Sequence, residues 1–298
     1  YLNKPTEPPE LIDRVQMLLE SSYGPTPDPI PVGVTLVHAS PMLPRLPELE
    51  AWQSESQQVI AVMGVRGGTG TTTTAINLAA TLAASGTVTT LADFDLTRGH
   101  IGLYLNQKSA GVLNTLATKP DGEIEDELSS HLITYTKNFQ LLLAHLNIDG
   151  RYPVISGSQA AKILLALSQT SQVTVVDLGS TFNDITRSTL ELADQVIICL
   201  RPERIALVAA RQLLSHLEKI LFPHIQTHVV IMDFSSGGTS LPKTAVEGFL
   251  GCPVAATIQI SPRDMAQAVN KAKPLATVNT QIEASITFQK FAQQFQKT

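Results

Sequence analysis

The sequence predicts an α/β fold in which a doubly wound, mostly parallel sheet lies between two layers of helices. After residue 57, short β-branched runs alternate with helical stretches, which is the pattern of consecutive βαβ units. The runs are almost continuously apolar, as expected for strands that are buried on both faces. A glycine-rich turn joins the first of these runs to the first helical stretch, and doubly wound sheets bind anionic ligands at such turns.

Two segments before residue 58 lack the alternating pattern. In residues 1–23, apolar side chains recur at i, i+4, i+7 and i+8 from Leu11, which predicts one amphipathic helix. Residues 24–57 are rich in proline and predict an extended, semi-rigid linker. We therefore expect a domain boundary in this linker and one large domain over residues 58–298.

Within the large domain, the apolar runs are expected as strands and the amphipathic stretches as helices. The expected strands are residues 59–63, 88–92, 139–144, 173–176, 195–200, 227–232 and 254–258. The expected helices are residues 72–84, 159–169, 183–192, 205–220, 244–250 and 263–272. Near the end of the chain, Phe288, Phe291, Ala292 and Phe295 form an apolar stripe at helical spacing, which we expect to pack in the core rather than on a membrane.

Composition excludes several function classes. The chain has 21 Lys and Arg against 26 Asp and Glu, a formal net charge of −5, so no basic field attracts nucleic acid. Its apolar stretches are much shorter than the ~20 residues that span a bilayer, and no signal peptide is recognisable at residue 1. We expect a cytoplasmic protein without specific nucleic-acid binding, whose contact with a membrane is at most peripheral.

The glycine-rich turn over residues 64–74 is the first candidate for function. Gly67, Gly68 and Gly70 allow the tight backbone path of a phosphate-binding loop, and the following helix begins near Thr72. Such a loop presents backbone N–H groups and the positive end of a helix to an anion. The segment therefore predicts a phosphate site.

Two classes of phosphate-binding protein use a loop of this kind. In a dinucleotide-binding enzyme, an acid near the end of the second strand binds the ribose, and Asp93 or Asp95 lies at about that spacing. In a P-loop NTPase, a further acid ends a later apolar strand and holds a magnesium-bound water. Asp177 follows the run 173–176 and fits this second requirement, which favours the P-loop class. An NAD-dependent dehydrogenase remains the minor alternative.

From about residue 59 onward, the chain resembles the MinD/ParA family of deviant-Walker ATPases, which are P-loop proteins. The family loop reads Lys-Gly-Gly-x-Gly-Lys-Thr-Thr, and residues 66–73 lie over it, while residues 93–95 match the family's Asp-x-Asp. Residues 95–105 resemble the switch region of the CpaE/TadZ branch, and residues 260–275 resemble the family's C-terminal pattern. Residues 1–20 resemble the end of a receiver domain, which CpaE/TadZ proteins commonly fuse to the ATPase domain.

The resemblance implies ATP and Mg²⁺ as ligands, and it implies roles for individual residues. Asp95 would position the attacking water, and Arg66 would stand for the deviant lysine that reaches the phosphates of the partner subunit in a nucleotide-dependent homodimer. Magnesium would be held by Thr72, Asp93 and Asp177. The nucleotide would be bound by Gly67, Gly68, Thr69, Gly70, Thr71, Thr72 and Thr73, with Asp233 in the place of an adenine-reading Asn.

Two departures from the family pattern bear on activity. Thr71 stands where the family has its P-loop lysine, so a cation normally placed on the β- and γ-phosphates is missing. At ~4 Å and an effective dielectric constant near 20, such a contact contributes about 4 kcal/mol before desolvation, so we expect weak or lost hydrolysis. Asp233 can accept but not donate a hydrogen bond when ionised, which changes the expected selectivity for adenine.

The function implied by the resemblance is that of a CpaE/TadZ-like protein. It would dimerise around ATP and help to place or assemble a type IV (Flp/Tad) pilus-secretion apparatus, with proteins of that machinery as partners, at the cell pole or the inner membrane surface. The alternative is an active ParA/MinD-type partitioning or positioning ATPase, whose cycle moves DNA or a division inhibitor.

Overall fold

The computed structural model describes residues 57–108, 113, 116, 124–145, 155–221, 223, 225–234 and 241–296. The amphipathic helix expected in residues 1–23 and all but the last residue of the linker expected over 24–57 lie outside the described residues. Among the helices of the described part, none is long and apolar enough to cross a membrane.

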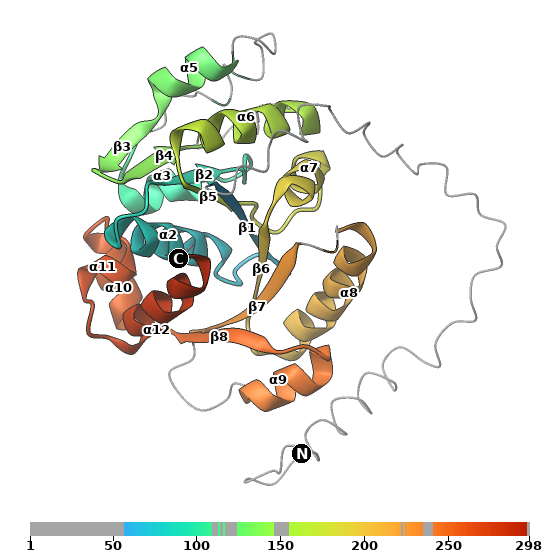
Figure 1. The fold of residues 1–298 in the computed structure, drawn as a ribbon. Coiled ribbons are helices and arrows are strands. Elements are labelled where there is room, and N and C mark those ends of the chain that lie inside the picture. The colour runs from blue at the N-terminus through green and yellow to red at the C-terminus, as the bar shows by residue number, and fades with distance from the viewer. Residues whose placement is uncertain are drawn as a thin grey trace, which may run out of the picture. The chain divides into compact units, whose positions relative to one another are not determined.

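The described residues form one sheet of eight strands in the order β3-β4-β2-β5-β1-β6-β7-β8 (Figure 1). All neighbouring strands are parallel except β3 and β4 at one edge. The strands are β1 (Gln58–Gly64), β2 (Thr89–Asp93), β3 (Ile133–Thr136), β4 (Phe139–Leu142), β5 (Val173–Asp177), β6 (Gln195–Leu200), β7 (Gln226–Asp233) and β8 (Val254–Gln259).

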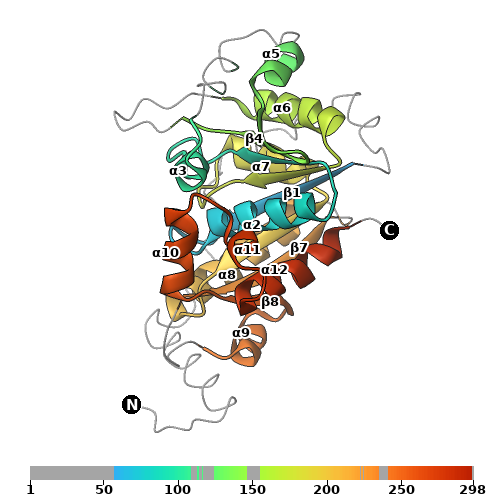
Figure 2. The same ribbon diagram turned by 90° about the vertical axis from the view of Figure 1, so that its left-hand side faces the viewer.

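Helices cover both faces of the sheet, so the expected three-layer α/β/α architecture is confirmed (Figures 1 and 2). One layer contains α2 (Thr71–Ala84), α3 (His100–Leu105), α10 (Pro262–Asn270), α11 (Leu275–Val278) and α12 (Glu283–Ala292), followed by a 3₁₀ turn over Gln293–Phe295. The other contains α5 (Ile124–His131), α6 (Gly157–Thr170), α7 (Asp184–Leu192), α8 (Arg204–Ile220) and α9 (Lys243–Leu250).

Helix α2 lies in the centre of its layer, between the sheet and helices α11 and α12. Its side chains are small or aliphatic, and most of them are buried, which suits a helix covered on several sides. The Asn77 side chain accepts a hydrogen bond from the Ala276 amide (2.8 Å), which joins α2 to α11. Phe288, Phe291 and Phe295 are each at most 2% exposed, so the expected core packing of the C-terminal stripe is confirmed.

The strand order determines where ligand-binding groups can meet. Strand β1 lies between β5 and β6, so the strand order reverses at β1. Doubly wound sheets bind ligands beyond the carboxyl ends of the strands at such a switch point. Asp177 ends β5 beside β1, and Asp93 ends β2 on the far side of β5. Asp93 and Asp177 are direct neighbours in the register of β2 and β5. The fold thus brings both predicted carboxylates to the edge that carries the glycine-rich loop.

Candidate phosphate-binding site

The glycine-rich loop follows β1 and leads directly into α2. Gly68 and Gly70 have φ angles of 77° and 87°, in the left-handed region that favours glycine. At Gly70 a Cβ would also lie 2.9 Å from the Met232 side chain, so two independent constraints require glycine there. Gly70 is the N-cap of α2 and makes no side-chain cap hydrogen bond. The first amides of a helix lack intrahelical partners, so this end suits an anion.

The start of the loop is anchored to the two strands beside β1. The Gly64 amide donates to the carbonyl of Gly179 beyond β5 (2.8 Å), and the Val65 amide donates to the carbonyl of Cys199 on β6 (3.2 Å). The loop is therefore held at both sides before any ligand binds, which reduces the ordering that binding requires.

Thr71, which stands in the place of the P-loop lysine, faces back toward the start of the loop. A Cβ at Gly64 would lie 2.3 Å from the Thr71 hydroxyl and 2.4 Å from that of Thr69, so these two hydroxyls occupy the volume beside Gly64. Thr71 is 7% exposed and Thr69 is fully buried, with its hydroxyl donating to the Arg66 carbonyl (2.9 Å). Position 71 thus contributes loop packing and no positive charge.

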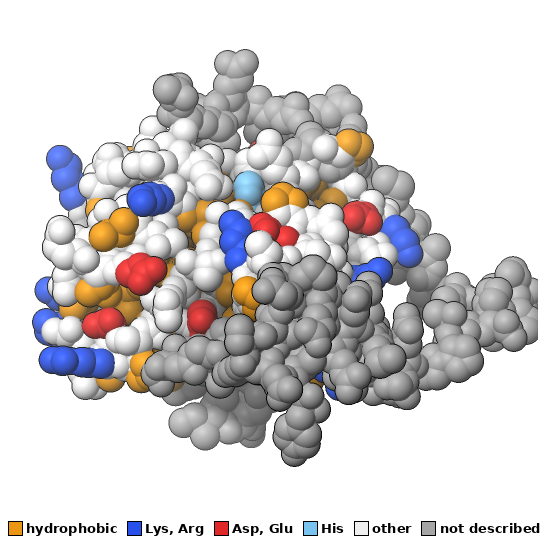
Figure 3. Space-filling view, turned by 90° about the horizontal axis from the view of Figure 1, so that it is seen from below, with side chains coloured by type: hydrophobic (Ala, Val, Ile, Leu, Met, Phe, Trp, Pro, Cys, Tyr) orange, Lys and Arg blue, Asp and Glu red, His pale blue; other side chains and the backbone are white. Residues whose placement is uncertain are grey.

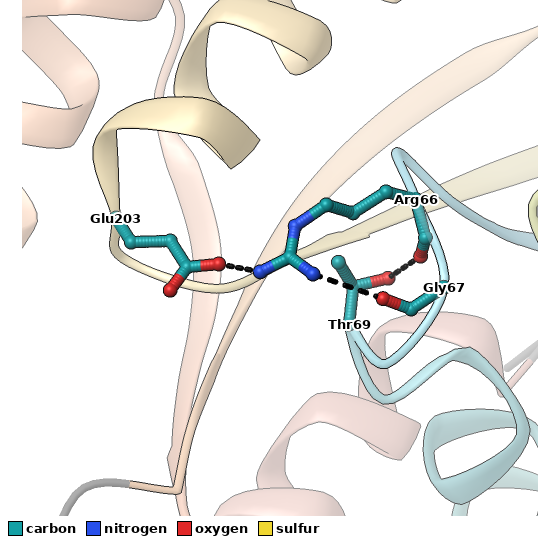
Figure 4. A network of polar contacts seen from close by, with 4 residues as sticks. All are labelled: Arg66, Gly67, Thr69 and Glu203. Carbon is teal, nitrogen blue, oxygen red and sulfur yellow. Dashed lines mark hydrogen bonds and ion pairs between the residues drawn. The ribbon is translucent and has the colours of Figure 1, made fainter.

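The Arg66 side chain contacts two residues of its own subunit. Its guanidinium forms an ion pair with Glu203, the residue before α8, and donates to the Gly67 carbonyl at 3.1 Å (Figure 4). The two side chains of the pair are 38% and 42% exposed, and ion pairs at such sites contribute about 1 kcal/mol or less. The cation lies beside the loop and is only weakly restrained.

Asp93 and Asp177 are buried carboxyl groups at the carboxyl ends of their strands. One oxygen of Asp177 accepts from the Gly179 amide (3.1 Å), and one oxygen of Asp93 accepts from the Asp95 amide (3.2 Å). The second oxygen of each is buried without a hydrogen-bond partner. Burial raises the pKa of Asp177 to about 6, although the Thr72 hydroxyl and the Gly179 amide oppose this. Burial and the charge of Asp177 raise the pKa of Asp93 well above its usual range.

The residues at this site fit a magnesium ion that takes only some of its ligands from the protein. Two buried carboxylate oxygens lack partners, and the Thr72 hydroxyl lies beside Asp177. In the described part of the chain, no three His, Cys, Asp or Glu side chains form a metal cluster. Magnesium at nucleotide sites is bound through one or two carboxylates together with phosphates and waters, so it needs no such cluster.

Asp95 lies between the ends of β2 and β5. Its carboxylate accepts from the Thr97 hydroxyl (2.7 Å) and contacts Gly179, where an added Cβ would lie 2.4 Å from the carboxylate. A cavity of about 260 Å³ opens beside it, lined by Phe94, Asp95, Leu96, Thr97, Ile155, Leu178, Thr181, Asn183, Asp184 and Ile185. None of these lining residues belongs to the glycine-rich loop, and Gly179, which Asp95 contacts, accepts a hydrogen bond from Gly64 at the start of that loop.

Two further predicted nucleotide-binding residues lie at the margin of the loop. Thr73 is buried in the first turn of α2, where its carbonyl accepts from the Asn77 side chain (2.7 Å). Asp233 ends β7, and its carbonyl accepts from the Ile260 amide (2.8 Å). It is Met232, the preceding residue, that packs against Gly70. The structure therefore brings β7 to the loop through Met232.

Sequence reasoning assigned no role to two residues that the structure places at the loop. Glu203 binds Arg66, and a Cβ at Gly67 would lie 3.6 Å from both terminal nitrogens of Arg98. Arg98 falls within the switch-like run 95–105, and that position was the available signal. Glu203 follows β6 without a recognisable motif, so only the folded chain reveals its contact.

Comparisons with known proteins agree with this geometry. A family model described as AAA domain (AAA_31) matches residues 57–229. An uncharacterized protein of Methanocaldococcus jannaschii is 23% identical over 254 residues, which cover 79% of this chain and 96% of that protein. The iron-sulfur cluster carrier protein of Escherichia coli K12 is 28% identical over 177 residues, which cover 56% of this chain and 44% of the carrier.

Solved structures show the same fold. The ParA family ATPase of Chlorobium tepidum TLS superimposes with a TM-score of 0.73 at 17% identity, covering 82% of this chain and all of that chain. The septum site-determining protein MinD of Pyrococcus horikoshii, solved with Mg-ADP, superimposes with a TM-score of 0.68 at 17% identity, covering 81% and 96%. The chain thus belongs to the AAA domain family AAA_31 and has the P-loop fold of the ParA and MinD ATPases.

Proposed function

We propose that the domain over residues 58–298 binds ATP with Mg²⁺ and dimerises around the nucleotide. The observation that carries this proposal is that Asp93 and Asp177, at the sheet edge that carries the glycine-rich loop, each have one buried carboxyl oxygen without a hydrogen-bond partner. Buried polar atoms of this kind are costly unless something binds them. A hydrated magnesium ion bound to nucleotide phosphates would be a suitable partner.

Each part of the site has a defined task in this proposal. The amides of the loop and of the first turn of α2 hold the phosphates. Thr72, Asp177 and Asp93 would hold a magnesium ion, which would supply positive charge against the phosphates. Asp95, at the rim between β2 and β5, orients a water toward the terminal phosphate. Because Thr71 adds no cation, hydrolysis is slow or absent, and ATP acts mainly as a switch.

The proposed dimer uses the edge that carries the loop. Arg66 leaves its weak pair with Glu203 and contacts phosphates of the partner subunit, because the fork of a guanidinium can hold two phosphate oxygens at once. Ile205 lies two residues beyond Glu203 and is 72% exposed, which is unusual for a large apolar side chain. Phe182, in the segment after β5, is 39% exposed. An interface at this edge would cover both side chains.

Among members of this fold, we propose the CpaE/TadZ branch, with a role in localising or assembling a type IV (Flp/Tad) pilus-secretion apparatus. The support is the switch-like run 95–105, the receiver-like residues 1–20 and the missing P-loop lysine. The partners would be proteins of the pilus or secretion machinery, met at the cell pole or the inner membrane surface.

The alternative is a partitioning or positioning ATPase, which the similarity to ParA and MinD structures favours. On the face seen in Figure 3, basic side chains are dispersed among acidic, apolar and uncharged ones. On this face (Figure 3), such a dispersed pattern gives little of the positive field that binds DNA. Deletion in the native host separates the two functions. Loss of pili with normal division and plasmid inheritance supports the first, and faulty division or plasmid loss supports the second.

The nucleotide class is tested by calorimetry of the purified protein with ATP and Mg²⁺ and, separately, with NAD. We expect saturable binding of ATP that weakens when Mg²⁺ is removed, because Asp93 and Asp177 are placed to act through the ion. We expect no binding of NAD. Tight NAD binding together with no response to ATP and Mg²⁺ would overturn the proposal.

A further inference from the structure

We propose that Arg98 is a phosphate-binding residue of this site and that it replaces, within the same subunit, the lysine that the loop lacks at position 71. This inference rests on the proposed binding of ATP, and it adds a residue to that site.

The geometry places the Arg98 guanidinium over the glycine-rich loop. A Cβ built at Gly67 would lie 3.6 Å from Nη1 and 3.6 Å from Nη2, so both terminal nitrogens of the guanidinium lie at the same distance from the side-chain position of Gly67. Gly67 carries no side chain, which leaves this approach open. An arginine fork presented edge-on can donate two parallel hydrogen bonds to a phosphate group.

The backbone that carries Arg98 is fixed by a tight turn. The amides of Arg98 and Gly99 both donate to the Asp95 carbonyl, at 3.1 and 3.3 Å. Gly99 has a φ angle of 58° and is the N-cap of α3, so α3 begins directly after the turn. Arg98 and Asp95 therefore belong to one small rigid unit, and a contact between Arg98 and a phosphate would also fix Asp95.

The ion pairing of the arginines near the loop also favours Arg98 as the residue that binds phosphate. Arg66 is paired with Glu203, whereas Arg98 is exposed and forms no ion pair within the described part of the chain. A cation that lies over Gly67 is placed beside the proposed phosphate cradle.

Arg98 can supply the phosphate-binding cation although position 71 of the loop is a threonine. Position 71 carries a hydroxyl that packs beside Gly64 and Thr69, and it supplies no cation. Arg98 instead approaches from the turn after β2, over Gly67. Arg98 thus supplies a cation for binding from another element, while position 71 itself stays uncharged and hydrolysis stays slow or absent.

The competing explanation is that Arg98 only balances the carboxylates of Asp95 and Asp177. The two explanations differ in what they predict for nucleotide affinity. A phosphate contact is lost when the guanidinium is removed, and it is partly kept by another cation. If Arg98 only balances the carboxylates, its removal changes the stability of the unliganded protein but takes no contact from the phosphates, so ATP binding is not weakened.

The test is calorimetry with ATP and Mg²⁺ on the unchanged protein, on Arg98→Ala and on Arg98→Lys. Lys219→Ala is the control, because Lys219 is an exposed cation fifteen residues beyond the start of α8, roughly 22 Å along the helix at a rise of about 1.5 Å per residue. Thermal melting without nucleotide is recorded for each variant. Arg98 is exposed, so the variants are expected to fold as the unchanged protein does.

We expect Arg98→Ala to weaken ATP binding by about tenfold or more, Arg98→Lys to recover part of the loss, and Lys219→Ala to stay within about twofold. If the unchanged protein binds ATP and Arg98→Ala binds it equally well, this inference is overturned and the proposed function stands. If the unchanged protein does not bind ATP with Mg²⁺, both are overturned.

Discussion

The carboxyl groups of Asp93 and Asp177 lie side by side at the ends of β2 and β5, and each has one buried oxygen without a hydrogen-bond partner. In the unliganded protein this arrangement opposes folding at neutral pH. The reason is that burial raises the pKa of each carboxyl, so that ionisation is less favourable in the folded state than in the unfolded chain. A site that costs stability when empty is expected where a cation has to bind.

At the residue scale we predict that Asp177→Asn stabilises the unliganded protein while weakening ATP binding in the presence of Mg²⁺. The folded-state pKa of Asp177 is about 6 against an ordinary value of 3.8. The native state therefore binds the proton more tightly than the unfolded chain, and stability falls as pH rises between these values. The free energy of unfolding should increase by roughly 1–3 kcal/mol at pH 7.5, and the gain should shrink toward pH 5.

Urea unfolding at pH 7.5 and pH 5, together with ATP calorimetry, measures both effects. Asp184→Asn, at an exposed position in the first turn of α7, is the control for losing a surface carboxylate. An Asp177→Asn protein that is less stable than the unchanged protein at pH 7.5, or that binds ATP with Mg²⁺ normally, would contradict the assignment.

At the scale of elements, the glycine-rich loop runs directly into α2. The first residue of α2 is the uncharged Thr71, at the position where the family has a lysine. The Thr71 hydroxyl packs against Gly64 and Thr69. In Thr71→Lys we expect the longer side chain to reach beyond these contacts, with its ammonium group in water or on a phosphate.

We predict that Thr71→Lys raises ATP affinity by about tenfold and increases any hydrolysis that Asp95 supports, because a positive charge is added at the phosphates. Thr71→Met is the matched control, since its side chain is long and flexible but uncharged. Calorimetry reports affinity, and release of inorganic phosphate reports hydrolysis. Equal affinities of the two variants would show that position 71 does not face the phosphates.

The strands of the sheet centre could be predicted from sequence because they are buried on both faces and appear as continuous apolar runs. The predicted strand 195–200 coincides with β6, and the others agree to within two residues. Strand β3 was not predicted. It is an edge strand with alternating half-buried and exposed residues and only four positions, which is too short for a clear period. Three short helices, α3, α5 and α11, were not predicted either, because each is too short to show a clear helical period of apolar residues.

The site was predictable to the extent that it lies at strand ends. Asp93 and Asp177 follow apolar runs directly, so the fold had to bring them to one edge. Arg98 and Glu203 lie in turns, and their contacts depend on how separate loops meet, which no local pattern encodes. The pairing of Arg66 with Glu203 was likewise unforeseen, and the contact of Arg66 with a partner subunit stays a prediction.

At the scale of the whole molecule, the account requires that two copies meet at the edge carrying the loop, with ATP between them. Arg66 is the residue that would cross this interface. We predict that Arg66→Ala abolishes ATP-dependent dimerisation and leaves the monomer folded, because the ion pair it removes is exposed and contributes about 1 kcal/mol or less. Circular dichroism checks the fold, and Lys219→Ala, which should dimerise normally, is the control.

The most direct test of the account is light scattering of the unchanged protein with and without ATP and Mg²⁺, at nucleotide concentrations shown by calorimetry to saturate the site. We predict a mass that doubles from the 32.1 kDa of a single chain when ATP and Mg²⁺ are both present, and that returns to this value when Mg²⁺ is removed. A protein that remains at 32.1 kDa with its site saturated would contradict the shared nucleotide site.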